Sequence, residues 1–254
     1  MPADLLGGFA GPMLLTQHGI GMVAPFDFAL DRELWRWVPD DVSLYLTRLP
    51  YVPVPMTVEM ATAISDVAAV HRATQDVLTP EPLVVAYACT SGSFIEGVAG
   101  ERVLVQTMRA AGAPAAVTTS GALTDALHLL GIKRLAIATP YIDPVTDRLV
   151  SYLGECGVEA ISSVGLGMLS HIWRVSYSEV VRIVRSVDRK DAEAMFISCT
   201  NLPTYDIIEP LERALGKPVL TANQVTMWGA LRAMGVESMA SEQWLVQASR
   251  PSAA

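Results

Sequence analysis

The sequence predicts an α/β fold of two similar lobes, each a parallel sheet flanked by helices, with a cleft between them. Three observations predict it. Strand-like apolar runs alternate with helix-like segments along most of the chain, which is typical of parallel sheets with helices on both faces. Two of these apolar runs end in Cys-Thr. Proline and glycine positions around both runs recur in the same order, which indicates an internal duplication with pseudo-two-fold symmetry.

The two cysteine runs are the best-matched pair. Residues 83–89 end at Cys89, and residues 194–199 end at Cys199. Their length and β-branched content predict buried strands of a parallel sheet. Small polar residues that can cap a helix follow each cysteine, so we expect both thiols where a strand ends and a helix begins.

The spacing downstream of the cysteines repeats as well. Pro114 and Gly131 lie 17 positions apart, and so do Pro218 and Gly235. Each repeat closes with a helix, and an exchange of the last helix between lobes is left open. The expected parts are a tail at 1–17, an N-terminal lobe at 18–131, a C-terminal lobe at 132–246 and a tail at 247–254.

Each element of the N-terminal lobe has a local signal. Pro25 ends the first strand, Pro39 ends a short helix, and prolines fill the loop at 50–55. Apolar residues at helical spacing from Ala61 to Ala68 predict one long helix, and Gly131 ends the last one. The expected strands are 19–24, 42–49, 83–88 and 115–117, and the expected helices are 30–37, 57–78, 96–111 and 121–130.

The C-terminal lobe repeats this alternation. Pro144 at a helix start and Gly157 after its end follow the usual placement of these residues. The loop at 165–175 shows no clear pattern, and the chain from Gln247 onward is expected to fray. The expected strands are 134–138, 158–164, 194–199 and 219–220, and the expected helices are 144–156, 177–187, 205–215 and 223–234.

Composition excludes several classes of function. The 254 residues are 51% hydrophobic, enough for a large core, and the net charge of −8 argues against a nucleic-acid partner. No apolar stretch reaches the roughly 18–20 residues that cross a bilayer, and the start lacks the basic residues of a signal peptide. Three cysteines, two of them at strand ends, favour free thiols in a reducing compartment. We therefore expect a cytoplasmic protein without a membrane partner.

The strand ends carry the candidate chemistry, because ligands of parallel α/β folds bind at the carboxyl ends of the strands. Helix-start N–H groups lower a thiol pKa and can hold a carboxylate. Two thiols on opposite faces of a small acid can racemise it by removing a proton from one face and returning one to the other. They can also isomerise a double bond by addition and release of a thiolate. The neighbouring donors are Thr90, Ser91, Thr200 and Asn201.

Neither reaction needs a metal or an organic cofactor, and we expect none. The chain has no P-loop, no G-x-G-x-x-G after a strand and no His-x-x-x-His pair. One buried cysteine is usually a core residue, but a pair at equivalent positions of a repeat favours catalysis. Cys156, at a helix end, is interpreted as structural. Tyr141, after a strand, belongs either to the site or to the packing around it. Pro203 removes an N–H near Cys199, so we expect the lower pKa at Cys89.

These residues resemble the aspartate/glutamate racemase superfamily and, within it, the maleate cis–trans isomerase and arylmalonate decarboxylase group. Residues 87–91, 139–141 and 197–200 carry the resemblance. Residues 223–226 with Trp228 look most similar to the isomerase-like proteins of ectoine-utilisation clusters. The resemblance implies a small carboxylate between two pseudo-symmetric lobes. It also implies roles for three residues: Cys89 as nucleophile, Cys199 as the group that handles the proton, and Tyr141 as a substrate ligand.

The chain departs from the maleate isomerases at two asparagines. Phe28 stands near the position of the first, in the turn that begins at Pro25, and residues 169–171 lack the second. We assign Pro25 and Phe28 to the substrate-binding set and expect a substrate other than maleate. The decarboxylases share Thr90 and Ser91 but lack the first cysteine.

The leading hypothesis is a cofactor-independent isomerase or racemase of a small carboxylic acid that uses Cys89 and Cys199. One alternative is an arylmalonate-type decarboxylase with Cys199 as proton donor. Another is a non-catalytic carboxylate-binding homologue. A homo-oligomer is also left open.

Overall fold

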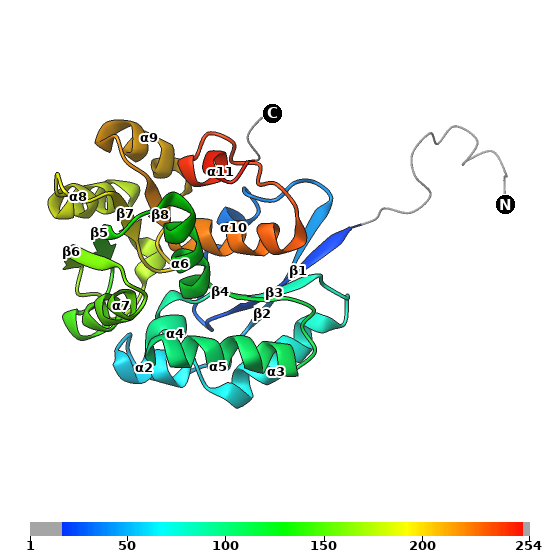
Figure 1. Ribbon diagram of the computed structural model, residues 1–254. Coiled ribbons are helices and arrows are strands. Elements are labelled where there is room, and N and C mark those ends of the chain that lie inside the picture. Colours follow the sequence, from blue (N-terminus) through cyan, green and yellow to red (C-terminus); the bar gives the residue numbers. More distant parts are fainter. Residues whose placement is uncertain (1–16, 251–254) are drawn as a thin grey trace, which may run out of the picture.

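The structure, a computed structural model that describes residues 17–250, contains two four-stranded parallel sheets (Figure 1). Their strands are β1 (His18–Ala24), β2 (Val42–Arg48), β3 (Val84–Tyr87), β4 (Ala116–Thr118), β5 (Arg134–Thr139), β6 (Glu159–Gly165), β7 (Ala194–Ile197) and β8 (Val219–Thr221). The first sheet has the order β2-β1-β3-β4, and the second has the equivalent order β6-β5-β7-β8. The predicted α/β fold with two similar parallel sheets is confirmed.

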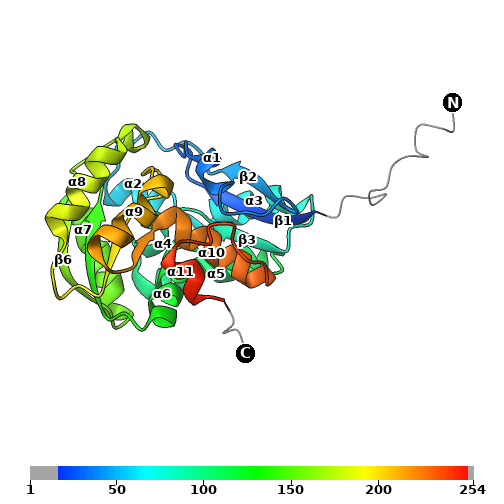
Figure 2. The ribbon, with the colours of Figure 1, turned by 90° about the horizontal axis from the view of Figure 1, so that it is seen from above.

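Helices cover the sheets. They are α1 (Asp31–Leu34), α2 (Val58–Ala63), α3 (Val67–Leu78), α4 (Thr90–Phe94), α5 (Gly97–Ala110), α6 (Thr119–Leu130), α7 (Asp143–Glu155), α8 (Tyr177–Val187), α9 (Tyr205–Leu215), α10 (Ala222–Met234) and α11 (Trp244–Ala248), with a 3₁₀ turn η2 (Ile172–Arg174). On the first sheet, α3 and α5 lie on one side and α10 on the other (Figure 1). On the second, α7, α8 and α9 contact β6, β5 and β8. Seen from above, the second sheet and its helices form one end of the molecule (Figure 2).

This double cover explains the continuous apolar runs in the sequence. Every residue of β3, β7 and β8 is buried, because neither face of these strands reaches solvent. Strands buried on both faces show no alternation of polar and apolar residues.

The last long helix, α10, follows β8 in the chain but packs on β3 and β4 of the first sheet. It crosses α6 at close range: a Cβ on Gly229 would lie 2.8 Å from the Ala122 Cβ. The Thr226 and Thr119 hydroxyls bond at 2.7 Å in the same contact. The helix that closes the second repeat therefore fastens the second half of the chain to the first sheet.

The segments at 57–78 and 244–248 differ from the sequence prediction. The long helix expected at 57–78 is two helices, because Thr57 caps α2 by accepting from the Met60 N–H and Asp66 caps α3 by accepting from the Ala69 N–H. Helix α11 extends to Ala248, into the segment expected to fray, because its apolar side chains Leu245 and Val246 are buried.

Candidate active site

A small cavity lies at the carboxyl ends of the strands, with both predicted thiols in its wall. Eight of the nine site residues predicted from the sequence line it: Cys89, Cys199, Thr90, Ser91, Tyr141, Thr200, Asn201 and Pro25. These residues follow strands of both sheets. Strand pairing places the strand ends of each sheet at one edge, and residues from both edges line the cavity.

Cys89 ends β3 and is the N-cap of the short helix α4. Its Sγ accepts a hydrogen bond from the Gly92 N–H at 3.4 Å and lies 3.8 Å from the Ser91 Oγ. Gly92 cannot carry a side chain here, because a Cβ would lie 2.2 Å from the Tyr87 Oη. That phenol is fixed in turn by a 2.8 Å hydrogen bond to the Ile64 carbonyl oxygen.

Cys199 follows β7 but does not start a helix, contrary to the prediction. Pro203 lacks an N–H to give, and α9 begins only at Tyr205. The segment from Cys199 forms a turn instead, with the Cys199 Sγ accepting from the Asn201 N–H at 3.4 Å. The Cys199 backbone has a φ of 91°, a strained conformation for a residue with a side chain. Strain of this kind concentrates at functional sites.

Burial dominates the acidity of both thiols. It raises the pKa of Cys89 to about 11, against hydrogen bonds from Gly92 and Ser91 that lower it. It raises the pKa of Cys199 to about 12, against hydrogen bonds from Asn201 and Tyr141. The pKa of Cys89 is the lower of the two, in the predicted order. The prediction that the thiol pKa values lie below the ordinary thiol value is wrong. Removal from water destabilises the thiolates more than these hydrogen bonds stabilise them.

Thr90 offers a free hydroxyl to the cavity. Its Oγ1 is buried and has no hydrogen-bond partner among the residues that the structure describes. A buried polar group without a partner is uncommon and costly. A carboxylate oxygen in the cavity would satisfy it.

Tyr141 follows β5 and is buried. Its Oη accepts a 3.4 Å hydrogen bond from the Ser198 Oγ, next to Cys199. Burial raises the Tyr141 pKa well above its ordinary value, and a negative charge on the thiolate form of either cysteine acts in the same direction. The phenol therefore stays protonated and can donate a hydrogen bond within the cavity.

Asn201 closes the cavity. Its Oδ1 accepts from the Ala29 N–H at 2.9 Å, and its Nδ2 donates to the Asp27 carbonyl oxygen at 3.1 Å. The side chain thus ties the turn after β1 to the turn after β7. Both polar atoms of the Asn201 side chain are therefore already hydrogen-bonded within the protein.

Phe28 is the one predicted site residue that does not line the cavity. Its side chain is buried in an apolar cluster that includes Leu34 and Trp37. Its neighbour Asp27 lines the cavity instead. Asp27 was not among the site residues predicted from the sequence.

Four apolar residues that were not predicted from the sequence complete the wall: Met56, Met60, Ile64 and Ile172. The loop before α2 meets the loop after β6, where the Met56 N–H donates to the Leu169 carbonyl oxygen at 2.8 Å. No local pattern marks such residues, because segments more than one hundred positions apart build this wall.

A buried carboxylate braces the Cys199 turn. Glu33 of α1 accepts from the Thr204 N–H at 3.0 Å, from the Thr204 Oγ1 at 2.8 Å and from the Asn223 Nδ2 at 3.1 Å. Asn223 also donates to the Thr200 carbonyl oxygen at 3.0 Å. This network joins α1, the Cys199 turn and the start of α10.

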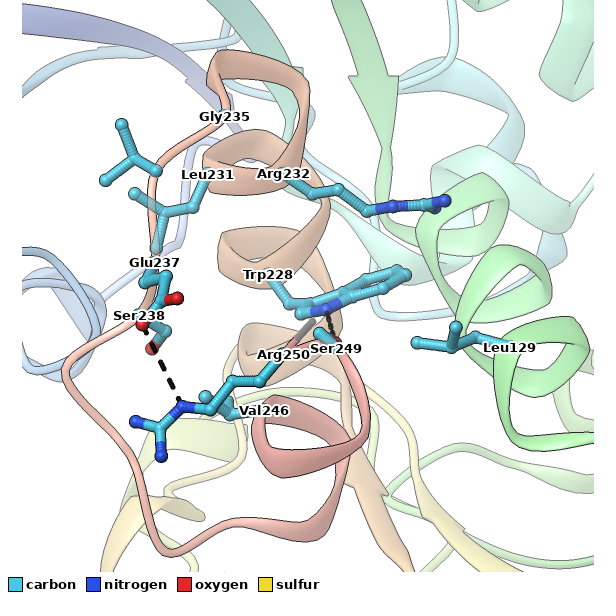
Figure 3. A pocket seen from close by; sticks show the side chains of 11 residues that line it. Leu129, Trp228, Leu231, Arg232, Gly235, Glu237, Ser238, Val246, Ser249 and Arg250 are labelled. Carbon is cyan, nitrogen blue, oxygen red and sulfur yellow. Dashed lines mark hydrogen bonds and ion pairs between the residues drawn. The ribbon is translucent and has the colours of Figure 1, made fainter. Parts of the chain in front are cut away.

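A second hollow lies between α6, α10 and the C-terminal segment (Figure 3). There the Trp228 Nε1 donates to the Ser249 Oγ at 2.6 Å, and the Arg232 guanidinium lies over the indole ring. Neither Cys89 nor Cys199 lines this hollow, so the candidate active site is the cavity at the strand ends.

Two classes of feature are absent from residues 17–250. No group of three or more His, Cys, Asp or Glu side chains is placed to hold a metal ion. No helix in this range is both long and apolar enough to pass through a bilayer.

Residues 62–245 match the family model of arylmalonate decarboxylase. The chain belongs to the arylmalonate decarboxylase family. It is 35% identical to arylmalonate decarboxylase of Bordetella bronchiseptica over 156 residues, which cover 60% of this chain and 65% of that one. It is 28% identical to maleate isomerase of Geobacillus stearothermophilus over 163 residues, which cover 61% and 65%. The matched regions thus span just under two thirds of these relatives.

Solved structures of this family share the fold. A double mutant of arylmalonate decarboxylase in its liganded form has a TM-score of 0.81 at 28% identity, covering 90% of this chain and 98% of that one. A Nocardia farcinica maleate cis–trans isomerase mutant with a covalently bound succinylcysteine intermediate has a TM-score of 0.80 at 23% identity, covering 91% and 98%. The predicted resemblance to maleate isomerases and arylmalonate decarboxylases is confirmed. The link to ectoine-utilisation proteins stays a prediction.

Proposed function

We propose that this member of the arylmalonate decarboxylase family is a cofactor-independent isomerase or racemase of a small carboxylic acid, with Cys89 and Cys199 as its catalytic pair. One observation carries the proposal: both thiols and the unpartnered Thr90 hydroxyl line the same cavity. The hydroxyl, the Tyr141 phenol and nearby N–H groups are suited to hold a carboxylate. The two thiols then act on the carbon next to it.

In racemisation, the thiolate of one cysteine removes the proton next to the carboxylate, and the thiol of the other donates a proton to the opposite face. In cis–trans isomerisation, the Cys89 thiolate adds to the double bond, rotation occurs about the resulting single bond, and expulsion of the thiolate restores the double bond. Burial keeps both thiols protonated near neutral pH. The proton donor is therefore ready, while the base or nucleophile must first lose its proton.

Decarboxylation is the second candidate, favoured by the 35% identity to the Bordetella bronchiseptica enzyme. Loss of carbon dioxide leaves a carbanion that one thiol must protonate. Cys199, with its pKa raised to about 12, is the more firmly protonated of the pair. This reaction needs only Cys199, whereas racemisation or isomerisation needs both thiols.

The test follows a panel of small acids by proton NMR in deuterium oxide, watching for exchange next to the carboxylate and for cis–trans conversion. We expect turnover by the native chain, a loss of at least about a hundredfold in Cys89→Ser and in Cys199→Ser, and little change in Cys156→Ser. Cys156 is a matched control, because it is a free thiol at the end of α7, outside the cavity.

The pattern of losses separates the candidates. Release of carbon dioxide from a malonate that survives Cys89→Ser but not Cys199→Ser indicates the decarboxylase. Binding of an acid with no exchange, isomerisation or decarboxylation indicates a carboxylate-binding protein and contradicts the proposal.

A further inference from the structure

The two thiols of the cavity differ in backbone conformation. Cys199 has a φ of 91°, in the range that favours glycine, whereas Cys89 has an ordinary extended φ of −145°. A strained backbone persists only where the surrounding structure enforces it. Contacts from outside the turn at 199–204 are therefore needed to hold the Cys199 thiol in the cavity wall.

Glu33, a buried residue of α1, makes such contacts at both ends of this turn. At the far end, its Oε2 accepts from the Thr204 N–H at 3.0 Å and its Oε1 from the Thr204 Oγ1 at 2.8 Å. At the near end it acts through Asn223, whose Nδ2 donates to the Glu33 Oε1 at 3.1 Å and to the Thr200 carbonyl oxygen at 3.0 Å. Thr200 directly follows Cys199 in the chain.

These contacts need both oxygens of a carboxylate. Each oxygen of Glu33 faces a donor of Thr204, and Oε1 faces the Asn223 amide as well. A glutamine at this position has one oxygen and one NH₂ group, so a donor would oppose a donor on one side. Glutamine thus keeps the shape of the side chain and breaks part of the network.

Other links attach α1 and the segment before it to the same region. The Asn201 Oδ1 accepts from the Ala29 N–H at 2.9 Å, and Arg36 forms an ion pair with Asp206 at 2.7 Å. Loss of the Glu33 contacts should therefore loosen the Cys199 turn while α1 stays in place.

We propose that Glu33 is a positioning residue for Cys199: it holds the turn at 199–204 in the strained conformation that keeps this thiol in the cavity wall. Glu33 does not line the cavity, so it acts through Thr204 and Asn223. It does not act on Cys89, whose backbone is unstrained. This inference rests on the proposed function, because it takes Cys199 as one of the two reacting thiols.

The first measurement needs no substrate. Iodoacetamide labels Glu33→Gln in a Cys156→Ser background at about pH 8.5, and mass spectrometry gives the rate at each thiol. We expect the Cys199 rate to rise at least about threefold, because a relaxed turn exposes its Sγ to water, where the thiolate forms more readily. The Cys89 rate should change less than about twofold, since its strand end is untouched.

The second measurement is steady-state kinetics with the acid of the panel that the native chain converts fastest. In Glu33→Gln, kcat should fall at least about tenfold while KM stays within about twofold, because the misplaced group acts on the reacting carbon and not on binding.

Glu212→Gln is the matched control. Glu212 is also a buried carboxylate that accepts from backbone N–H groups, but its donors belong to Val219 and Trp244, outside the Cys199 turn. The same substitution there should leave the labelling ratio and kcat unchanged.

A second pair of variants keeps the test open where Glu33→Gln does not fold. Thr204→Val removes the hydroxyl that donates to Glu33 and should shift the labelling ratio and kcat in the same direction, whereas Thr204→Ser keeps the hydroxyl and should resemble the native chain.

The outcomes separate the two proposals. Equal changes at Cys89 and Cys199, no change at either, or the same change in Glu212→Gln overturns the positioning role. So does a raised KM at constant kcat, or native turnover by Glu33→Gln, and both leave the proposed function intact. Absence of turnover by the native chain overturns the proposed function instead, while the labelling ratio still decides whether Glu33 holds the Cys199 thiol.

Discussion

The Cys89 and Cys199 thiols show two effects in opposition. Each Sγ accepts a hydrogen bond from one backbone N–H, which favours the thiolate, but Cys89 is buried and Cys199 is half-buried, which disfavours it. Enclosure wins at both positions. The site is therefore suited to a thiol that donates a proton and to a thiolate that forms transiently.

Alkylation tests these acidities. In a Cys156→Ser background, the rate of iodoacetamide labelling should rise about tenfold per pH unit between pH 7 and 9.5 at both cysteines, because only the thiolate reacts. Cys89 should label faster than Cys199, since its pKa is about 11 rather than about 12. Mass spectrometry of the digested protein measures each rate. A plateau below pH 9 at Cys89 would show that hydrogen bonding, not burial, controls its acidity.

At the scale of elements, the contact between α10 and α6 depends on a small residue. A Cβ on Gly229 would lie 2.8 Å from the Ala122 Cβ and 3.1 Å from the Val117 Cγ1. A Cβ on Gly154, in the last turn of α7, would have no such neighbour within 4 Å. The two helical glycines thus differ in what surrounds them.

Alanine substitutions at these glycines should change stability in opposite directions. Gly154→Ala should stabilise by about 0.5–1 kcal/mol through its higher helix propensity. Gly229→Ala should destabilise by about 1–3 kcal/mol, less that gain, because the two helices must separate. Urea unfolding measures both. The double variant Ala122→Gly with Gly229→Ala should recover part of the loss; no recovery would contradict the proposed contact.

For the whole molecule, stability should depend on pH through buried carboxyl groups. Glu212 of α9 is fully buried, and its two oxygens accept from the Val219 and Trp244 N–H groups at 3.2 Å. Burial raises its pKa from 4.5 to about 7. Between these values the folded chain binds more protons than the unfolded chain, so stability falls as pH rises.

The free energy of unfolding should accordingly decrease between pH 4.5 and 7, by on the order of 2–3 kcal/mol from Glu212. Asp27, Glu33 and Glu101 act in the same direction, since burial raises each of their pKa values. Denaturant unfolding of the native chain and of Glu212→Gln at pH 5, 6, 7 and 8 isolates the Glu212 part as the difference in slope. Parallel slopes would mean that Glu212 does not titrate in this range.

The expected cytoplasmic location and the homo-oligomer stay predictions, as does the division at residues 131 and 132. Gel filtration of the intact chain tests whether it forms a homo-oligomer.

The sequence alone determined the repeated alternation of strands and helices, the cysteines at two strand ends and the donors that follow them. These features are local: a strand buried on both faces must be apolar throughout, and the polar residues that end it mark the point where chemistry can begin. For this reason the linear pattern was enough to place Cys89, Thr90 and Ser91 at one strand end, and Cys199, Thr200 and Asn201 at the other.

Only the tertiary structure decided what surrounds these residues. Asp27 lines the cavity and Phe28 does not. Their turn is held by Asn201, which is 172 positions from Ala29 and hydrogen-bonds to its N–H. The apolar wall and the pKa values of the thiols depend on burial, which many distant segments create together. A linear pattern records which side chains a segment offers, but enclosure and electric field are properties of the space in which the folded segments meet.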